Sequence, residues 1–195
     1  MIEIDRYNKL KEKYGHTSSW TIWKEEDSTP KSNTGDMSVF NDDNLCSILH
    51  DDYVFVGLNG SSTHGTQENI SWKNFHSDYS GQNDFKLRYA LKDTNFWGCY
   101  ITDVIKDYFE VDSEKVMKYL KDNPDIISKN IEILRNELEI LSDKKPVLIA
   151  IGNDSYNILN RYLKEEYKIL KIMHYSNWIS KENYRQKVLE VLKNV

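Results

Sequence analysis

The chain has 195 residues, of which 39% are hydrophobic and 29% charged, and its formal net charge is -5. This length and composition indicate one globular domain over residues 1–195 and exclude disordered and fibrous proteins. No run of about 18 apolar residues is present and the N-terminus is charged, so we expect a cytoplasmic protein without a membrane partner. The only cysteines, Cys46 and Cys99, are too few for a disulfide framework or a four-cysteine zinc or iron–sulfur site.

Four runs rich in β-branched and aromatic residues predict strands at 53–57, 97–101, 146–151 and 167–173. The first and third are continuously apolar, which is typical of a mostly parallel sheet covered by helices on both faces. Helix-period segments lie between the strands and after the last of them, and the clearest covers residues 126–141. The expected fold is therefore an α/β class, three-layer α/β/α sandwich around a central, mostly parallel four-stranded sheet. The polar segment 24–44 is interpreted as a loop within this domain, with the freedom to be mobile.

Polar residues follow the first predicted strand, in the stretch Gly57-Leu58-Asn59-Gly60-Ser61. Glycines let a backbone approach a ligand closely, and ligands of open α/β sheets bind beyond the carboxyl ends of the strands. The alternative is a turn in which Asn59 only satisfies backbone groups of the loop. The stretch is not a phosphate-binding loop, because it lacks the lysine of that motif.

Two further polar residues follow other predicted strands. Asp103 comes after the second, where it could line the ligand crevice or, alternatively, cap a helix. His174 follows the fourth and could stabilise charge, or could be a buried histidine bonded to backbone. Because Asn59, Asp103 and His174 all fall at carboxyl ends, we expect them in one crevice.

In order along the chain, Gly57-Leu58-Asn59, Tyr100-Ile-Thr-Asp103-Val-Ile-Lys106 and His174-Tyr175-Ser176 resemble motifs of the uracil-DNA glycosylase superfamily. The resemblance spans about residues 53 to 180. It implies a monomeric DNA N-glycosylase that flips a damaged or modified base out of DNA and hydrolyses its glycosidic bond without a metal or cofactor.

The resemblance also implies roles for individual residues. Catalytic roles fall to Asn59, which would orient the attacking water, and His174, which would stabilise charge on the departing base. The base would be held by Gly57, Leu58, Asp103 and an aromatic ring, for which Phe75 is preferred over Trp72. DNA contacts are expected from Ser61, Ser176, Trp178, Ile179 and Lys181, with Trp178 or Ile179 as the wedge that enters the base stack.

The chain departs from the superfamily's motifs at three positions. Gly60 and Tyr175 replace motif prolines, which predicts less rigid loops. Asp103 stands where related members carry an asparagine that reads uracil. An ionised carboxylate only accepts hydrogen bonds, whereas cytosine presents an amino donor, so we hypothesise a preference for cytosine-type bases.

The charges are distributed unevenly. Residues 156–195 carry eight Lys or Arg against four Glu, so the basic part of the chain contains the His174 loop. This permits DNA binding near Lys168, Lys171, Lys181, Arg185 and Lys187, although a solvated helix surface would look the same. Two other functions stay open: a non-catalytic relative that binds nucleic acid or protein, and an unrelated ligand-binding α/β module.

Overall fold

Within the residues that our computed structural model describes (1–60, 70–77, 79, 81–106, 108–193 and 195), five strands form one sheet in the order β1-β3-β2-β4-β5. The bounds of the strands are β1 Ser18–Trp20, β2 His50–Asn59, β3 Cys99–Ile105, β4 Val147–Ile151 and β5 Ile169–Ile172. Strands β3, β2, β4 and β5 run parallel, so the predicted α/β class with a mostly parallel sheet is confirmed.

The predicted number of four strands is wrong, because β1 adds a fifth strand at the edge. It pairs antiparallel with β3, with Ser18 opposite Thr102 and Trp20 opposite Tyr100. The strand has three residues, two of them serines, so the sequence lacks the β-branched pattern that reveals a strand. The predicted second strand is also displaced, since β3 begins at Cys99 and continues to Ile105.

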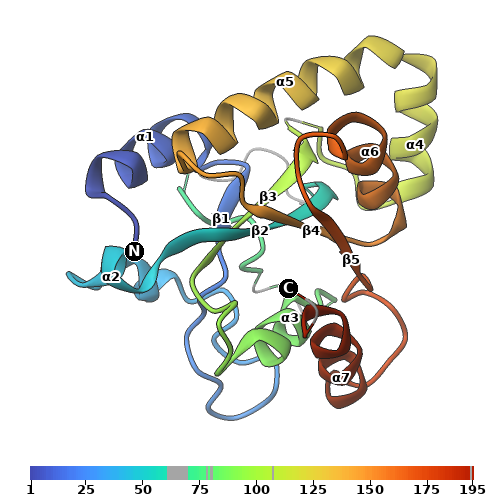
Figure 1. The fold of residues 1–195 in the computed structure, drawn as a ribbon. Coiled ribbons are helices and arrows are strands. Elements are labelled where there is room, and N and C mark those ends of the chain that lie inside the picture. Colours follow the sequence, from blue (N-terminus) through green and yellow to red (C-terminus); the bar gives the residue numbers. More distant parts are fainter. Residues whose placement is uncertain (61–69, 78, 80, 107, 194) are drawn as a thin grey trace.

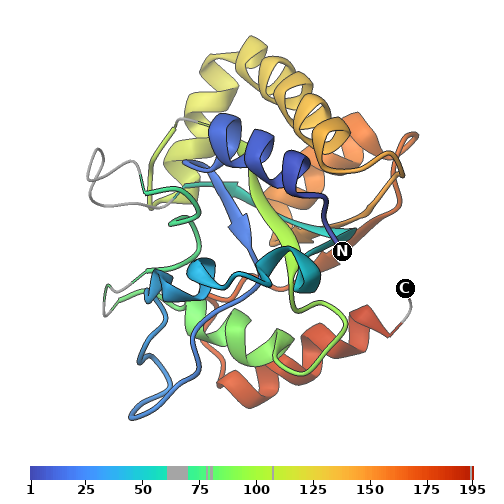
Figure 2. The ribbon, with the colours of Figure 1, turned by 90° about the vertical axis from the view of Figure 1, so that its left-hand side faces the viewer.

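Helices cover both faces of the sheet (Figures 1 and 2). One face carries α1 Ile4–Tyr14, α4 Ser113–Asp122, α5 Pro124–Leu141 and α6 Asn153–Leu163, and the other carries α3 Asp84–Leu91 and α7 Lys181–Leu192. The short elements η1 Met37–Asn41 and α2 Leu45–Ile48 precede β2. No helix among the described residues has both the length and the apolar character needed to cross a membrane.

The central strand β2 is apolar because both of its faces are buried. Val54 and Val56 belong to the hydrophobic cluster beneath α1 and α5, and Phe55 belongs to the cluster beneath α3 and α7. Alternate side chains point to opposite faces, and both faces are buried. The chain leaves β2 for β3 on one side and later reaches β4 on the other, so a topological switch point lies between β2 and β4.

A buried ion pair lies between the sheet and α5. Lys106 Nζ is 2.6 Å from Glu137 Oε2, and both side chains are almost fully buried. The hydroxyls of Tyr100 and Thr102 donate to Glu137 Oε1 at 2.8 and 2.9 Å, while the Lys106 ammonium also contacts Thr102 Oγ1. The carboxylate is thus surrounded by donors, which is the condition under which a buried charge is tolerated.

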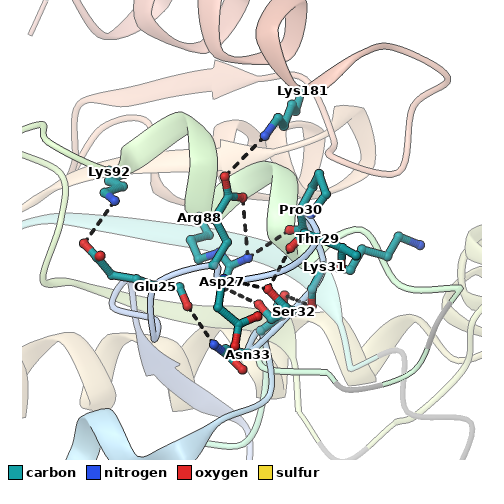
Figure 3. Close-up of polar contacts among 12 residues, drawn as sticks. Glu25, Asp27, Thr29, Pro30, Lys31, Ser32, Asn33, Arg88, Lys92 and Lys181 are labelled. Atoms are coloured by element: carbon teal, nitrogen blue, oxygen red, sulfur yellow. Dashed lines mark hydrogen bonds and ion pairs between the residues drawn. The ribbon is translucent and has the colours of Figure 1, made fainter.

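The polar segment after β1 is fastened to α3 by one buried arginine (Figure 3). Arg88 donates from Nη1 to the carbonyl oxygens of Lys24 and Ser32, at 2.7 and 2.8 Å, and from Nη2 to that of Pro30 at 2.9 Å. These carbonyls face inward and have no strand partner, so the guanidinium supplies the donors that the irregular backbone needs. Within the segment 24–44, which is interpreted as a loop, residues 24–32 are thus tied to α3 by these hydrogen bonds.

We expect Arg88→Met to destabilise the protein by roughly 3 kcal/mol, because three carbonyls lose a charged donor. Urea unfolding measures this loss, and limited proteolysis should cut the variant within residues 24–34. Arg135→Met is the matched control, since Arg135 forms more exposed ion pairs with Glu132 and Glu166 and should change the stability by less than about 1 kcal/mol. Equal losses in the two variants would show that Arg88 has no special part in holding this segment.

Candidate functional site

Asp103 lies within β3, beside the central strand. Its Cα is in register with Gly57 of β2, and a Cβ atom added to Gly57 would lie 2.3 Å from Asp103 Oδ1. Glycine at this position is therefore what lets the carboxyl group lie against the neighbouring strand. The alternative that Asp103 caps a helix is wrong, because the next helix, α4, is capped by Asp112 instead.

The carboxyl group of Asp103 is buried and has one fixed hydrogen bond. Asn74 Nδ2 donates to Asp103 Oδ2 at 2.8 Å and to the carbonyl of Thr17 at 2.8 Å. Burial raises the pKa of Asp103 to about 7, and the Asn74 hydrogen bond and the Lys106 charge oppose this rise. An acid with such a pKa can donate or accept a proton near neutrality.

The ring of Phe75 lies against Gly57, the residue of β2 that Asp103 also approaches. Its ring atoms would lie 3.4 Å from a Cβ atom at Gly57. The ring and Asp103 Oδ1 therefore both approach the Cα of this glycine. Phe75 has a left-handed φ of 65°, which is unusual for a bulky residue. Trp23 Nε1 donates to the Phe75 carbonyl at 3.0 Å and secures this conformation. Strained residues of this kind cluster at functional sites.

Trp72, the other ring considered for base stacking, is directed elsewhere. It is buried in the hydrophobic cluster beneath α1 and α5, and its Nε1 donates to the Tyr7 hydroxyl at 2.8 Å. Leu58 also packs against this cluster. Side chains alternate along β2, so the Leu58 side chain leaves the face that carries Gly57, and only its backbone stays near the candidate site.

Asn59, the last residue of β2, joins two loops. Its Nδ2 donates to the carbonyl oxygens of Gly60, Tyr108 and Glu110, at 2.9, 3.1 and 2.9 Å. Asn59 therefore does satisfy backbone groups of the loops, as the alternative interpretation of this residue predicted. Its Oδ1 accepts no hydrogen bond from the described part of the chain, and this oxygen is the group that could orient a water molecule.

His174 follows β5 and lies beside the end of β4. A Cβ atom added to Gly152, which follows β4 with a φ of 93°, would lie 3.4 Å from His174 Cβ. The backbone N–H of Ser176 donates to His174 Nδ1 at 3.1 Å, and Ser176 Oγ lies 2.8 Å from the same nitrogen. Because Nδ1 accepts, the neutral ring carries its proton on Nε2. Burial lowers the pKa of His174 to about 4, which keeps the ring neutral.

Tyr175 anchors the His174 loop where a motif proline was expected. Its ring is buried beneath α3 and α7, and its hydroxyl hydrogen-bonds to Asp84 at the start of α3. The backbone N–H of Ser77 also donates to Asp84, at 3.1 Å to Oδ2. Burial raises the pKa of Asp84 to about 6. The loop is therefore fastened by packing and a hydrogen bond at the position of the absent proline.

Sequence reasoning missed Asn74, Asp84 and the anchoring role of Tyr175. Asn74 adjoins Phe75, so a polar residue beside the expected base platform was a signal that could have found it. Asp84 reads as an ordinary acidic residue in the first turn of a helix. Only its burial and its contacts with distant residues distinguish it.

The residues expected to contact DNA mostly line one shallow groove of about 650 Å³ between the first turns of α3 and α7. The lining residues are Asn83, Lys86, Ser176, Asn177, Trp178, Ile179, Ser180 and Asn183. Trp178 is fully exposed, and Lys86 Nζ holds the loop by donating to the Asn177 carbonyl at 2.9 Å. Ser61, the remaining expected contact in the first motif, lies outside the described residues.

Two basic residues near the groove are already engaged within the protein. Lys181 Nζ is 3.6 Å from Glu26 Oε1, an ion pair drawn in Figure 3. The same ammonium lies over the ring of Tyr89. Arg185 donates to carbonyl oxygens at the end of α3, including that of Ala90 at 3.2 Å. Both charged groups therefore form contacts within the protein. The expectation that they lie open along a DNA backbone is not supported by these contacts.

Metal-binding clusters of three or more His, Cys, Asp or Glu side chains do not occur among the residues described. Comparison with known proteins found no matching family, no matching curated protein and no matching solved structure. The function is accordingly argued from the site itself.

Proposed function

We propose that this protein is a DNA glycosylase that hydrolyses the N-glycosidic bond of a flipped-out base, either uracil or a cytosine-type base. The observation that carries the proposal is the convergence of Asp103, Gly57 and Phe75 around one point of the sheet. Asn59 ends the same strand as Gly57, and His174 lies at the end of the adjoining strand β4. Four parallel strands with helices on both faces are compatible with a uracil-DNA glycosylase-like sandwich.

In this mechanism the base stacks on Phe75 and is read by Asp103. Water held by Asn59 Oδ1 adds to the sugar C1′ as the C–N bond breaks, and the electron pair of that bond leaves with the base. The neutral His174 ring donates from Nε2 to the oxygen on which negative charge develops. The water loses its proton to solvent, and the base gains one from solvent.

The groove beside the His174 loop supports contact with the DNA strand. Ser176 would bind a phosphate, and the exposed ring of Trp178, next to Ile179, would fill the gap left by the flipped base. Lys86 and Lys181 beside the groove already serve internal contacts, so we expect modest affinity that depends strongly on stacking. We propose that the protein acts as a cytoplasmic monomer without a metal or cofactor.

An incision assay on oligonucleotides containing uracil, cytosine or 5-hydroxymethylcytosine tests this function. We expect the protein to create abasic sites, which alkali converts to strand breaks, and Asn59→Ala to lower the rate at least about 100-fold. The control Asn157→Ala changes an exposed asparagine of α6 and should behave like the unaltered protein. Thermal unfolding should verify that both variants fold.

The bonding of Asn59 favours one other function, a non-catalytic protein that binds nucleic acid with the same groove. The three hydrogen bonds that its amide nitrogen donates to Gly60, Tyr108 and Glu110 stabilise loops. The absence of abasic sites from every substrate, together with binding of single-stranded oligonucleotides that is lost in Trp178→Ala, would favour this function over hydrolysis.

A further inference from the structure

The two oxygens of the Asp103 carboxyl group differ in their surroundings. Oδ2 accepts a hydrogen bond from Asn74 Nδ2, whose other hydrogen is donated to the Thr17 carbonyl. The orientation of the Asn74 amide is fixed by these two bonds. A proton on Oδ2 would face the N–H of Asn74 and break its hydrogen bond, so a proton bound by Asp103 belongs on Oδ1.

Oδ1 is the Asp103 oxygen nearest to Gly57, the residue of β2 that the ring of Phe75 also approaches. It lies 2.3 Å from the position of a Cβ at Gly57, and the Phe75 ring lies 3.4 Å from that position. Oδ1 accepts no hydrogen bond from the residues that the structure describes. The atom that gains or loses the proton is therefore the one that lies against Gly57, on the side of β2 that Phe75 also approaches.

Charged and titratable groups from several elements surround Asp103. Lys106, at the end of β3, favours the ionised form, while Glu137 of α5 and Asp84 of α3 oppose it. Tyr175, from the loop before α7, also lies close enough to interact with Asp103. Burial outweighs the favourable contacts and raises the pKa of Asp103 to about 7, so both protonation states are populated near neutral pH.

We propose that Asp103 selects the base by its protonation state. With a proton on Oδ1 it donates to the keto oxygen of a uracil-type base, and without one it accepts from the exocyclic amino group of a cytosine-type base. This inference rests on the proposed function, because it assumes that the base stacks on Phe75. It extends that function, because the class of base that the protein prefers changes with pH.

The test compares release of cytosine-type bases with release of uracil from matched oligonucleotides between about pH 6 and pH 8. The ratio should rise about tenfold per pH unit, because one proton distinguishes the two states. His174 stays neutral over this range, since burial lowers its pKa to about 4. A ratio that stays constant over the range would overturn the inference even if both bases are released.

Two variants make the test specific to Asp103. Asp103→Asn carries a non-titrating donor and should favour uracil with a ratio independent of pH. Asp84→Asn removes a negative charge that raises the pKa of Asp103, so a given value of the ratio should be reached at a lower pH. A ratio at each pH that is unchanged in Asp84→Asn, or a pH-dependent ratio surviving in Asp103→Asn, would assign the effect to another group.

Binding of free uracil and free cytosine, measured by calorimetry over the same pH range, separates this inference from the proposed function. If no base is released from DNA but the two affinities exchange order with pH in the unaltered protein and not in Asp103→Asn, the inference stands and the glycosylase function fails. If neither free base binds and none is released, both fail.

Discussion

Replacing His174 with alanine is expected to lower the rate of base release by about 10²–10³-fold, the cost of removing one well-placed donor to a developing anion. The reason is the fixed orientation of the ring. The Ser176 backbone N–H donates to Nδ1, so the proton of the neutral imidazole stays on Nε2 without rearrangement during the reaction. Single-turnover incision assays measure the effect on the chemical step.

The matched control for His174 is His50→Ala. His50 begins β2 and lies at the opposite end of that strand from Asn59, so its removal should leave base release nearly unchanged. A loss of similar size in both variants would indicate a general defect in folding. A normal rate in His174→Ala would remove His174 from the mechanism.

The low pKa of His174 also predicts a stability difference. The ring stays neutral in the folded protein down to about pH 4, whereas a histidine exposed to water has a pKa of 6.5. The unfolded chain therefore binds more protons between these values, and the folded state loses stability as the pH falls from 6.5 towards 4. This loss should be smaller in His174→Ala.

The largest effect on stability is expected from Glu137→Gln, at about 3–5 kcal/mol. The substitution leaves the Lys106 ammonium buried without its counter-charge, and it weakens the acceptor of the Tyr100 and Thr102 hydroxyls. Solvent cannot compensate, because both charged side chains are almost fully buried. Urea unfolding followed by circular dichroism measures the change in the free energy of unfolding.

A double variant distinguishes an unpaired charge from a general packing defect. Combining Glu137→Leu with Lys106→Met removes both charges and keeps apolar volume, so it should recover most of the stability lost in Glu137→Gln. If the double variant is as unstable as the single one, the buried charge of Lys106 is not the cause. The cost would then arise from the loss of the hydroxyl network.

Several features of the fold followed from local sequence patterns. The apolar runs at 53–57 and 146–151 predicted two parallel strands buried on both faces, and β2 and β4 contain most of these residues. The spacing of apolar residues between 126 and 141 predicted a helix, and α5 covers these residues. Such patterns are readable because burial on a sheet or a helix face repeats every few residues.

The polar residues at strand ends were also predictable, but their partners were not. Parallel strands end at one edge, which is why Asn59 and His174 were expected near each other. The contacts of Asp103 depend on Asn74 and Asp84, which approach from loops and a helix on other parts of the chain. No periodic signal marks a hydrogen bond between residues so far apart in sequence.

For the charges, too, the sequence determines one part and the tertiary structure another. The sequence determines that residues 156–195 are the basic part of an acidic chain. Only the tertiary structure decided that Lys181 pairs with Glu26 and that Arg185 binds the end of α3. It also decided that Asp103 is buried with one oxygen against Gly57, since desolvation depends on every segment that packs around a group.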